Sequence, residues 1–158
     1  MSKIITKKMI KDYEELGVVY IPSLFKNHVG NLKKGIEFNL NNPGPYAAEN
    51  LRKKENGRFF DDYCNWERIP EFRKTIFDNE IITAAAKLMQ SQSVQLFHDH
   101  VLVKEPGTSK DTPWYSDGPY YFINGKKTIS FWVPLDPVKE ASLRMVAGSH
   151  KWGKQVLP

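Results

Sequence analysis

The dipeptide Asn124-Gly125 separates two runs that are rich in aromatic and β-branched residues. Asn-Gly favours the positive φ angles of a two-residue turn, so it is the strongest local hairpin signal in the chain. In the run 127–135 that follows, apolar side chains alternate with polar ones, and Trp132 is the one large aromatic on the polar side. The pattern predicts a hairpin with one core face and one face that suits the wall of a cavity.

The segment before this hairpin carries Tyr115 and Asp117. Residues i and i+2 of an extended segment project to the same side, so these two side chains share a face while Ser116 points away. Many non-haem iron sites use this spacing: a His and a carboxylate two residues apart join a distant second His, and three metal positions stay open. Here a Tyr stands at the first position. The segment is typical of the rim of an iron site with one part changed.

Length and composition indicate one folded domain. The chain has 158 residues, of which 41% are hydrophobic and 13% aromatic, which favours a β-rich core. The net charge of +5 comes from scattered basic residues, so nucleic acid is not expected as a partner. The single cysteine, Cys64, excludes an internal disulfide and is expected to be packed rather than reactive. Neither a signal peptide nor a stretch of roughly 20 apolar residues is present, so we expect a cytoplasmic protein that does not enter the membrane.

The first 93 residues are expected to be mostly helical, because apolar residues recur there at helical spacing. The expected helices begin after the cap residue Thr6, near Val29, at Pro70 and after the cap residue Asn79. A β-branched run over 18–21 predicts a short strand. The polar stretch from Tyr46 to Gly57 is interpreted as a surface loop or a mobile lid.

A period of two over residues 96–104 predicts a strand with His98 and His100 on the same side. Two histidines at this spacing can chelate a metal. The pattern favours the alternative, in which they are strand residues that bond to neighbours or line a cavity wall. A further short strand is predicted over 142–146, and a turn over 147–153 follows it.

The order of these elements resembles the phytanoyl-CoA dioxygenase family, which are iron(II)- and 2-oxoglutarate-dependent oxidoreductases built on a double-stranded β-helix, or jelly roll. The matching phrases cover residues 97–108, 112–114, 117, 130–137 and 148–153. The resemblance implies an α+β, mainly β, cupin-like fold with N-terminal helices. It also implies a single domain over residues 1–158, in which residues 1–93 form the helical part and residues 94–158 supply the first strands of the jelly roll.

The resemblance also implies roles for particular residues. Asp117 matches the iron-binding carboxylate of the family's His-x-Asp motif, and Tyr115 stands at the position of the first iron-binding His. Trp132 matches a residue that helps to wall the 2-oxoglutarate pocket, and His100 falls on a strand position that also approaches this co-substrate. The implied cofactors are Fe(II) and 2-oxoglutarate, whereas His150 belongs to a turn that lies outside the metal site in the family.

Two departures from the family pattern weaken the expected activity. A phenol must lose a proton with a pKa of about 10 before it binds a metal well, and it then favours ferric over ferrous iron. In the family, the second iron-binding His and the Arg that binds 2-oxoglutarate follow the turn around His150, whereas this chain stops at Pro158. We therefore expect a jelly roll truncated before its last core strands, with open edges through which the chain can associate with itself.

The expected function is a dioxygenase (hydroxylase) of this family that is impaired or inactive as the chain stands, acting on a small molecule for which an anionic substrate is one option. The alternative is a non-catalytic jelly-roll protein that serves as a binding or interaction module. Iron binding and 2-oxoglutarate turnover separate the two. Since the second His and the Arg are absent, we expect that Tyr115→His alone does not restore activity.

Overall fold

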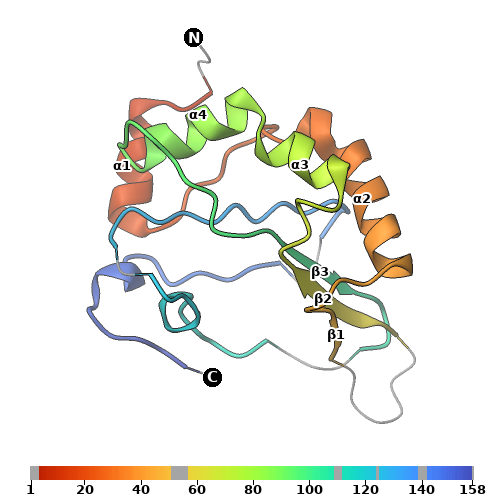
Figure 1. Ribbon diagram of the computed structural model, residues 1–158. Helices are drawn as coiled ribbons and strands as arrows, with labels where there is room; N and C mark the ends of the chain where they lie inside the picture. The colour runs from red at the N-terminus through yellow and green to blue at the C-terminus, as the bar shows by residue number, and fades with distance from the viewer. Residues whose placement is uncertain (1–3, 51–56, 109–111, 124, 139–141, 158) are drawn as a thin grey trace. The chain divides into compact units, whose positions relative to one another are not determined.

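The computed structural model describes residues 4–50, 57–108, 112–123, 125–138 and 142–157 (Figure 1). The chain divides into two compact units, each built from segments that are distant in sequence. The first unit combines Met1–Lys26, Asn79–Val94 and Pro113–Pro158, and the second combines Asn27–Asp78 and Gln95–Thr112. The single domain expected over residues 1–158 stays a prediction.

Helix α1 (Lys7–Leu16) of the first unit has the ends that its sequence predicts. The Thr6 side chain accepts a hydrogen bond from the Met9 N–H at 3.1 Å, which satisfies one of the free donors at the start of the helix. Gly17 ends the helix with a φ of 79°, a left-handed conformation that glycine adopts without steric cost, and its N–H donates to the Tyr13 carbonyl. The predicted helix after Thr6 is confirmed.

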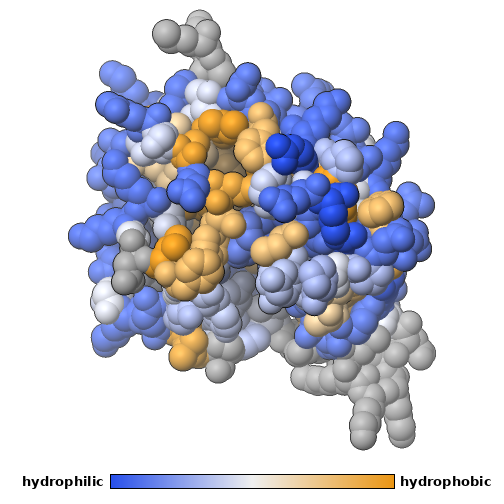
Figure 2. Space-filling view, viewed as in Figure 1, coloured by the Kyte–Doolittle hydropathy of each residue, from blue (hydrophilic) through white to orange (hydrophobic). Residues whose placement is uncertain are grey.

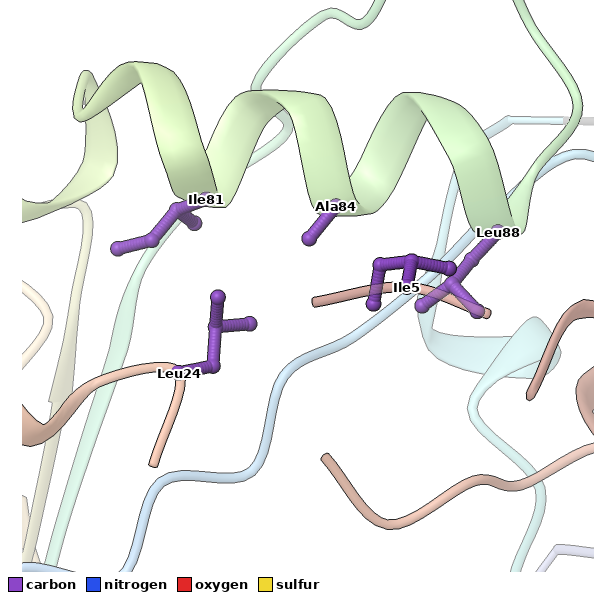
Figure 3. Packing of buried hydrophobic residues seen from close by; sticks show 5 residues of the cluster. All are labelled: Ile5, Leu24, Ile81, Ala84 and Leu88. Atoms are coloured by element: carbon purple, nitrogen blue, oxygen red, sulfur yellow. The ribbon is translucent and has the colours of Figure 1, made fainter. Parts of the chain in front are cut away.

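Helix α4 (Asn79–Leu88) supplies the main part of the core of the first unit. Figure 3 shows Ile81, Ala84 and Leu88 on one side of α4, where they face Ile5 and Leu24. The spacing of three and four residues places all three α4 side chains on one stripe, as the sequence predicts. Ile129 and Phe131 pack against this cluster, so the apolar side of the run 127–135 is a core face, as expected.

The strands predicted in the last third of the chain are not formed. Among described residues 112–123, 125–138 and 142–157, the only regular elements are the 3-10 turns η2 (Gly118–Tyr120) and η3 (Ser149–Lys151). The predicted strands over 127–135 and 142–146 are therefore wrong, as is the one over 18–21, while Asn124 of the predicted hairpin turn lies outside the described residues. Alternation determines which side chains face the core, but a strand also needs a neighbouring backbone to pair with.

The second unit contains an antiparallel sheet in the order β1-β2-β3 (Figure 1). Its strands are β1 (Ala48–Glu49), β2 (Phe59–Tyr63) and β3 (His100–Lys104). In the register of β2 with β3, Phe60 pairs with Val103 and Asp62 with Val101. Strand β3 confirms part of the strand expected over 96–104. The expected loop from Tyr46 to Gly57 contains β1 instead, and its residues 51–56 lie outside the described residues.

Helices α2 (Val29–Asn41) and α3 (Pro70–Ile76) cover one face of this sheet and confirm two further predicted helices. Phe60 and Val101 from the sheet form a buried cluster with Ile69 and Phe72, against which apolar residues of α2 pack. The two helices approach closely at Gly35, where an added Cβ would lie 2.5 Å from the Phe72 ring. The helices therefore shield the inner face of the sheet from water.

The described part of the chain is α+β, as expected, but it contains more helix than strand. The expectation of a mainly β chain is therefore not met by these residues, because only three short strands find partners. No helix among the described residues is long and apolar enough to cross a membrane.

Candidate functional site

Asp117 lies at the point where an extended segment turns into η2. Its φ of −65° and ψ of −32° are helical, and its carbonyl accepts a hydrogen bond from the Tyr120 N–H at 3.0 Å. Ser116 is held by the segment near the C-terminus, because its N–H donates to the Val156 carbonyl at 2.9 Å and its Oγ accepts from the Val156 N–H at 2.8 Å. The backbone of Ser116 and Asp117 is thus anchored on both sides.

The side chains around Asp117 are mainly tyrosines. Tyr121 lies near both the Asp117 carboxylate and the Ser130 hydroxyl. The Tyr115 ring meets the Tyr120 ring edge to face, with the ring centroids 5.8 Å apart. The spacing of the iron motif does not identify Tyr121 or Ser130. The only signals were the place of Ser130 on the polar side of its run and the position of Tyr121 one turn after Asp117.

Both phenols near Asp117 hold their protons more tightly than a free tyrosine. Burial raises the pKa of Tyr115, and the charge of Asp117 and the neighbouring Tyr121 and Tyr120 raise it further. Burial also raises the pKa of Tyr121; the hydrogen bond from Ser130 opposes this change, while Asp117 adds to it. At neutral pH these side chains are therefore neutral phenols rather than phenolates.

The donors around Asp117 do not fit an iron(II) centre. Iron(II) oxygenase sites use two neutral imidazoles and one carboxylate, whereas this surrounding supplies one carboxylate and neutral hydroxyls. Within the described ranges, no three side chains of His, Cys, Asp or Glu lie close enough together to hold a metal ion. Tyr115 stands at the position where the His-x-Asp motif has a histidine, so the motif supplies no imidazole beside Asp117.

The two residues expected near 2-oxoglutarate belong to different units. Trp132 is half exposed in the first unit, the unit that also holds Asp117 and Tyr115. His100 lies on β3 in the second unit, on the sheet face opposite the helices. Each residue is described within its own unit, so the common pocket that the family resemblance implies stays a prediction.

His98 and His100 belong to a group of aromatic rings around Tyr63. Tyr63 stacks on Tyr46 with centroids 5.0 Å apart, and its ring lies 5.6 Å from the His100 ring and 6.0 Å from the His98 ring. Burial among these groups lowers the pKa of His100, although the nearby Asp61 carboxylate opposes the change. These contacts favour the interpretation of the two histidines as strand residues that contact their neighbours.

Asp62, on the opposite face of β2, is a fully buried carboxylate. Its Oδ2 accepts hydrogen bonds from Asn39 Nδ2 and from the Gly44 N–H, both at 2.7 Å, and its Oδ1 accepts from the Tyr63 N–H at 2.9 Å. An Arg68 nitrogen lies 3.5 Å away. Burial alone would raise the pKa of Asp62. The hydrogen bonds that the carboxylate accepts, chiefly from Asn39 and Gly44, outweigh the effect of burial and lower the pKa. This carboxylate joins α2 to the sheet.

The turn around His150 covers the C-terminal end of α1. His150 Nε2 lies 3.1 Å from the Glu14 carbonyl oxygen, and the Gly148 N–H donates to the Leu16 carbonyl at 2.9 Å. These two donors satisfy carbonyl groups that a helix end otherwise leaves free. A Cβ at Gly17 would overlap the His150 ring. The turn therefore has a structural role, and the expectation that His150 lies outside the metal site stays a prediction.

Cys64 differs from its prediction, since it is exposed rather than packed. Partial loss of contact with water raises the pKa of the Cys64 thiol, and the negative charges of Asp99 and Asp62 raise it further. A raised pKa reduces the fraction of thiolate, which is the reactive form.

Comparison with protein-family models places most of the chain in one family. The family model for phytanoyl-CoA dioxygenase (PhyH) matches residues 13–158, which is most of the chain. Neither the curated proteins nor the solved structures contain a match. Members of the matched family use Fe(II) and 2-oxoglutarate. The chain belongs to the phytanoyl-CoA dioxygenase family.

Proposed function

We propose that this chain is an iron(II)/2-oxoglutarate-type oxygenase whose iron site is impaired, so that it does not turn over as it stands. Family membership supports the oxygenase ancestry. The observation that carries the impairment is the surrounding of Asp117, in which Tyr115 and Tyr121 offer neutral phenols instead of an imidazole. A neutral phenol is a weak ligand for a ferrous ion.

The native fold in this proposal is the jelly roll of the family. The run 127–135 forms no strand among the described residues, although Ile129 and Phe131 pack against the core while Trp132 is half exposed. In this fold, Trp132 and His100 are the positions proposed to approach 2-oxoglutarate.

The reaction of the family couples hydroxylation of a substrate to the conversion of 2-oxoglutarate into succinate and carbon dioxide. Because the donors around Asp117 do not fit iron(II), we assign no step of that reaction to this chain. A small molecule stays the proposed ligand class, and the net charge of +5 is compatible with an anionic one.

Anaerobic titration with iron(II), in the presence and absence of 2-oxoglutarate, tests this proposal. Binding of the keto acid to iron gives a weak visible charge-transfer band. We expect neither a band nor saturable binding that depends on Asp117, and Asp117→Ala is the matched control. Robust decarboxylation of 2-oxoglutarate by the purified chain would contradict the proposal that its iron site is impaired.

A second candidate is a non-catalytic binding or interaction protein, which the exposed aromatic side chains favour. Phe122 is 91% exposed, and Trp114, Trp152 and Leu157 are each more than half exposed. Figure 2 shows hydrophobic patches on a surface that is otherwise mostly hydrophilic. Soluble proteins rarely leave such patches uncovered unless they bind a partner.

A second copy of the chain is the proposed partner for this candidate. Strand β3 lies at the end of the strand order, so one of its edges faces no described strand and can pair with another chain. Sedimentation over a wide range of protein concentration tests the idea, and we expect the apparent mass to rise with concentration. A mass that stays that of one chain would exclude self-association.

A further inference from the structure

Ser116 and Val156 join two segments of the first unit that are distant in sequence. The Ser116 N–H donates to the Val156 carbonyl at 2.9 Å, and the Val156 N–H donates to Ser116 Oγ at 2.8 Å. The Ser116 hydroxyl also donates to the Val156 carbonyl, at 3.2 Å. Opposite residues of an antiparallel strand pair exchange two bonds through their backbones. Here the side-chain oxygen of Ser116 replaces its carbonyl as the acceptor, so this one residue satisfies both backbone groups of Val156.

The residue before Val156 packs on the same stretch of backbone. A Cβ at Gly118 would lie 2.7 Å from the Gln155 amide oxygen and 3.0 Å from the Gln155 amide nitrogen. The Gln155 amide therefore lies against the Gly118 backbone, in space that a larger residue would fill. Residues 116–118 thus form a short docking edge, which binds Gln155 and Val156.

The segment 154–157 is attached mainly through this docking edge. Residues 151–157 are all exposed, and Leu157 is 66% exposed. Among the described residues, Ser116 is the only hydrogen-bond partner of the backbone from 153 to 157. Hydrogen bonds that water can replace contribute little net stability, and no buried side chain of the segment adds to them. The segment can therefore leave the docking edge at a small cost in free energy.

Gly153 provides a hinge just before this segment. Its φ of 63° is left-handed, a conformation that glycine adopts freely but that strains a residue with a Cβ. No atom lies within 4 Å of the position that a Cβ would take, so the backbone has room to turn. The turn before the hinge is fixed, because the Gly148 N–H donates to the Leu16 carbonyl of α1. An anchored turn, a hinge and a weakly held segment thus follow one another along the chain.

We propose that the docking edge of one copy of the chain binds Gln155 and Val156 of a second copy, so that two copies exchange their segments 154–157. Segment exchange requires a hinge and a site that makes the same contacts on the second copy. The exchanged pair keeps every hydrogen bond of the single chain, because the two docking edges are identical. This interface depends neither on the iron site nor on the edge of β3.

Disulfide trapping with the whole chain tests the proposal. Cys64 is first replaced by serine, because it is exposed. Gly118→Cys and Gln155→Cys are then introduced into separate copies, which are mixed under mild oxidation and analysed by mass spectrometry. We expect a disulfide between the two variants, in an amount that rises with protein concentration. Both substitutions in one chain should give a bridge within that chain, since the two positions are in contact.

The trapped disulfide should depend on Ser116. Ser116→Ala in the Gly118→Cys copy removes the acceptor of the Val156 N–H and should lower the yield of the mixed disulfide about fivefold. Val156→Pro in the Gln155→Cys copy removes the same hydrogen bond from the other side and should have a similar effect. Ser93→Ala is the matched control, because Ser93 is an exposed serine of the same unit, and it should leave the yield unchanged. Circular dichroism verifies that each variant is folded.

The hinge predicts an effect in the opposite direction. Gly153→Ala in the Gln155→Cys copy strains the bend that returns the segment to its own docking edge, so the yield of the mixed disulfide should rise.

Three results would overturn the proposal. The first is a yield of mixed disulfide no higher than that of Gly118→Cys paired with Ser93→Cys, which measures random collision. The second is a yield that neither Ser116→Ala nor Val156→Pro lowers. The third is the lack of a bridge in the chain that carries both cysteines. None of these results bears on the iron titration, so this proposal and the impaired iron site can fail separately.

Discussion

Replacing Asp62 by alanine should destabilise the protein more than any nearby substitution on the sheet. The carboxylate is fully buried, and its removal leaves Asn39 Nδ2, the Gly44 N–H and the Tyr63 N–H without their acceptor. Each buried donor that loses its partner costs about 1–1.5 kcal/mol or more. Asp62→Ala should therefore lower the free energy of unfolding by about 3–5 kcal/mol, because three donors lose their acceptor together.

Asp61→Ala is the matched control, because it changes the same residue type one position earlier on the same strand. Asp61 is only partly buried and accepts a hydrogen bond from Asn50 at 3.1 Å. Its replacement should cost about 1 kcal/mol or less. Urea unfolding followed by circular dichroism gives both values, provided that the slope m is the same for the variants. Equal losses for Asp61→Ala and Asp62→Ala would refute the structural role of Asp62.

The effect of Asp62 should also depend on pH in a defined direction. The pKa of Asp62 is lower in the folded protein than in the unfolded chain, so the folded state binds a proton less readily. The stabilisation is therefore fully present above the unfolded pKa of about 3.9 and is lost as the pH falls through the folded pKa. The difference in stability between the unchanged chain and Asp62→Asn should shrink in acid. A difference that grows on acidification would contradict the reasoning.

Two further predictions concern Gly17 and Cys64. Gly17→Ala should lower the free energy of unfolding by about 1–3 kcal/mol, because alanine is strained at the left-handed φ of 79° and its Cβ overlaps the His150 ring. Gly30→Ala is the control: it lies in α2 with no atom within 4 Å of the added Cβ, so it should raise the free energy of unfolding by about 0.5–1 kcal/mol. Equal effects of the two substitutions in urea unfolding would contradict both assignments. Cys64, although exposed, should react with a thiol reagent at pH 7 more slowly than a cysteine peptide, because its pKa is raised; a faster reaction would show that the thiolate is stabilised instead.

The helices could be predicted from the sequence because their signals are local. Thr6 and Gly17 mark the two ends of α1 with residues whose conformations suit those positions. The stripe of Ile81, Ala84 and Leu88 needs only one side of one helix to meet a core. Such signals depend on residues a few positions apart, so they do not depend on how distant segments of the chain fold.

The sheet was harder to predict because a strand depends on distant partners. Strand β2 was missed since its sequence does not alternate cleanly: Phe59 and Phe60 are both buried, and Asp62 points inward with a full set of hydrogen bonds. The run 127–135 alternates well and still forms no strand in the described residues. Alternation is therefore neither sufficient nor required when pairing and buried polar contacts decide the outcome.

The candidate site could be predicted only in part. The pattern identified Asp117 and its neighbour Tyr115, because the spacing of the iron motif is local. It did not identify Tyr121, which reaches Asp117 through the η2 turn, or Ser130, which comes from another segment. Proximity of this kind follows from the three-dimensional path of the backbone rather than from residue spacing.

The titration with iron(II) and 2-oxoglutarate determines whether the residues around Asp117 can hold the metal of the family. It requires oxygen-free conditions and a parallel titration of Asp117→Ala. We expect both proteins to give the same weak, unsaturable response and no charge-transfer band. A band that saturates with a micromolar dissociation constant in the unchanged chain, and is lost in Asp117→Ala, would contradict this expectation.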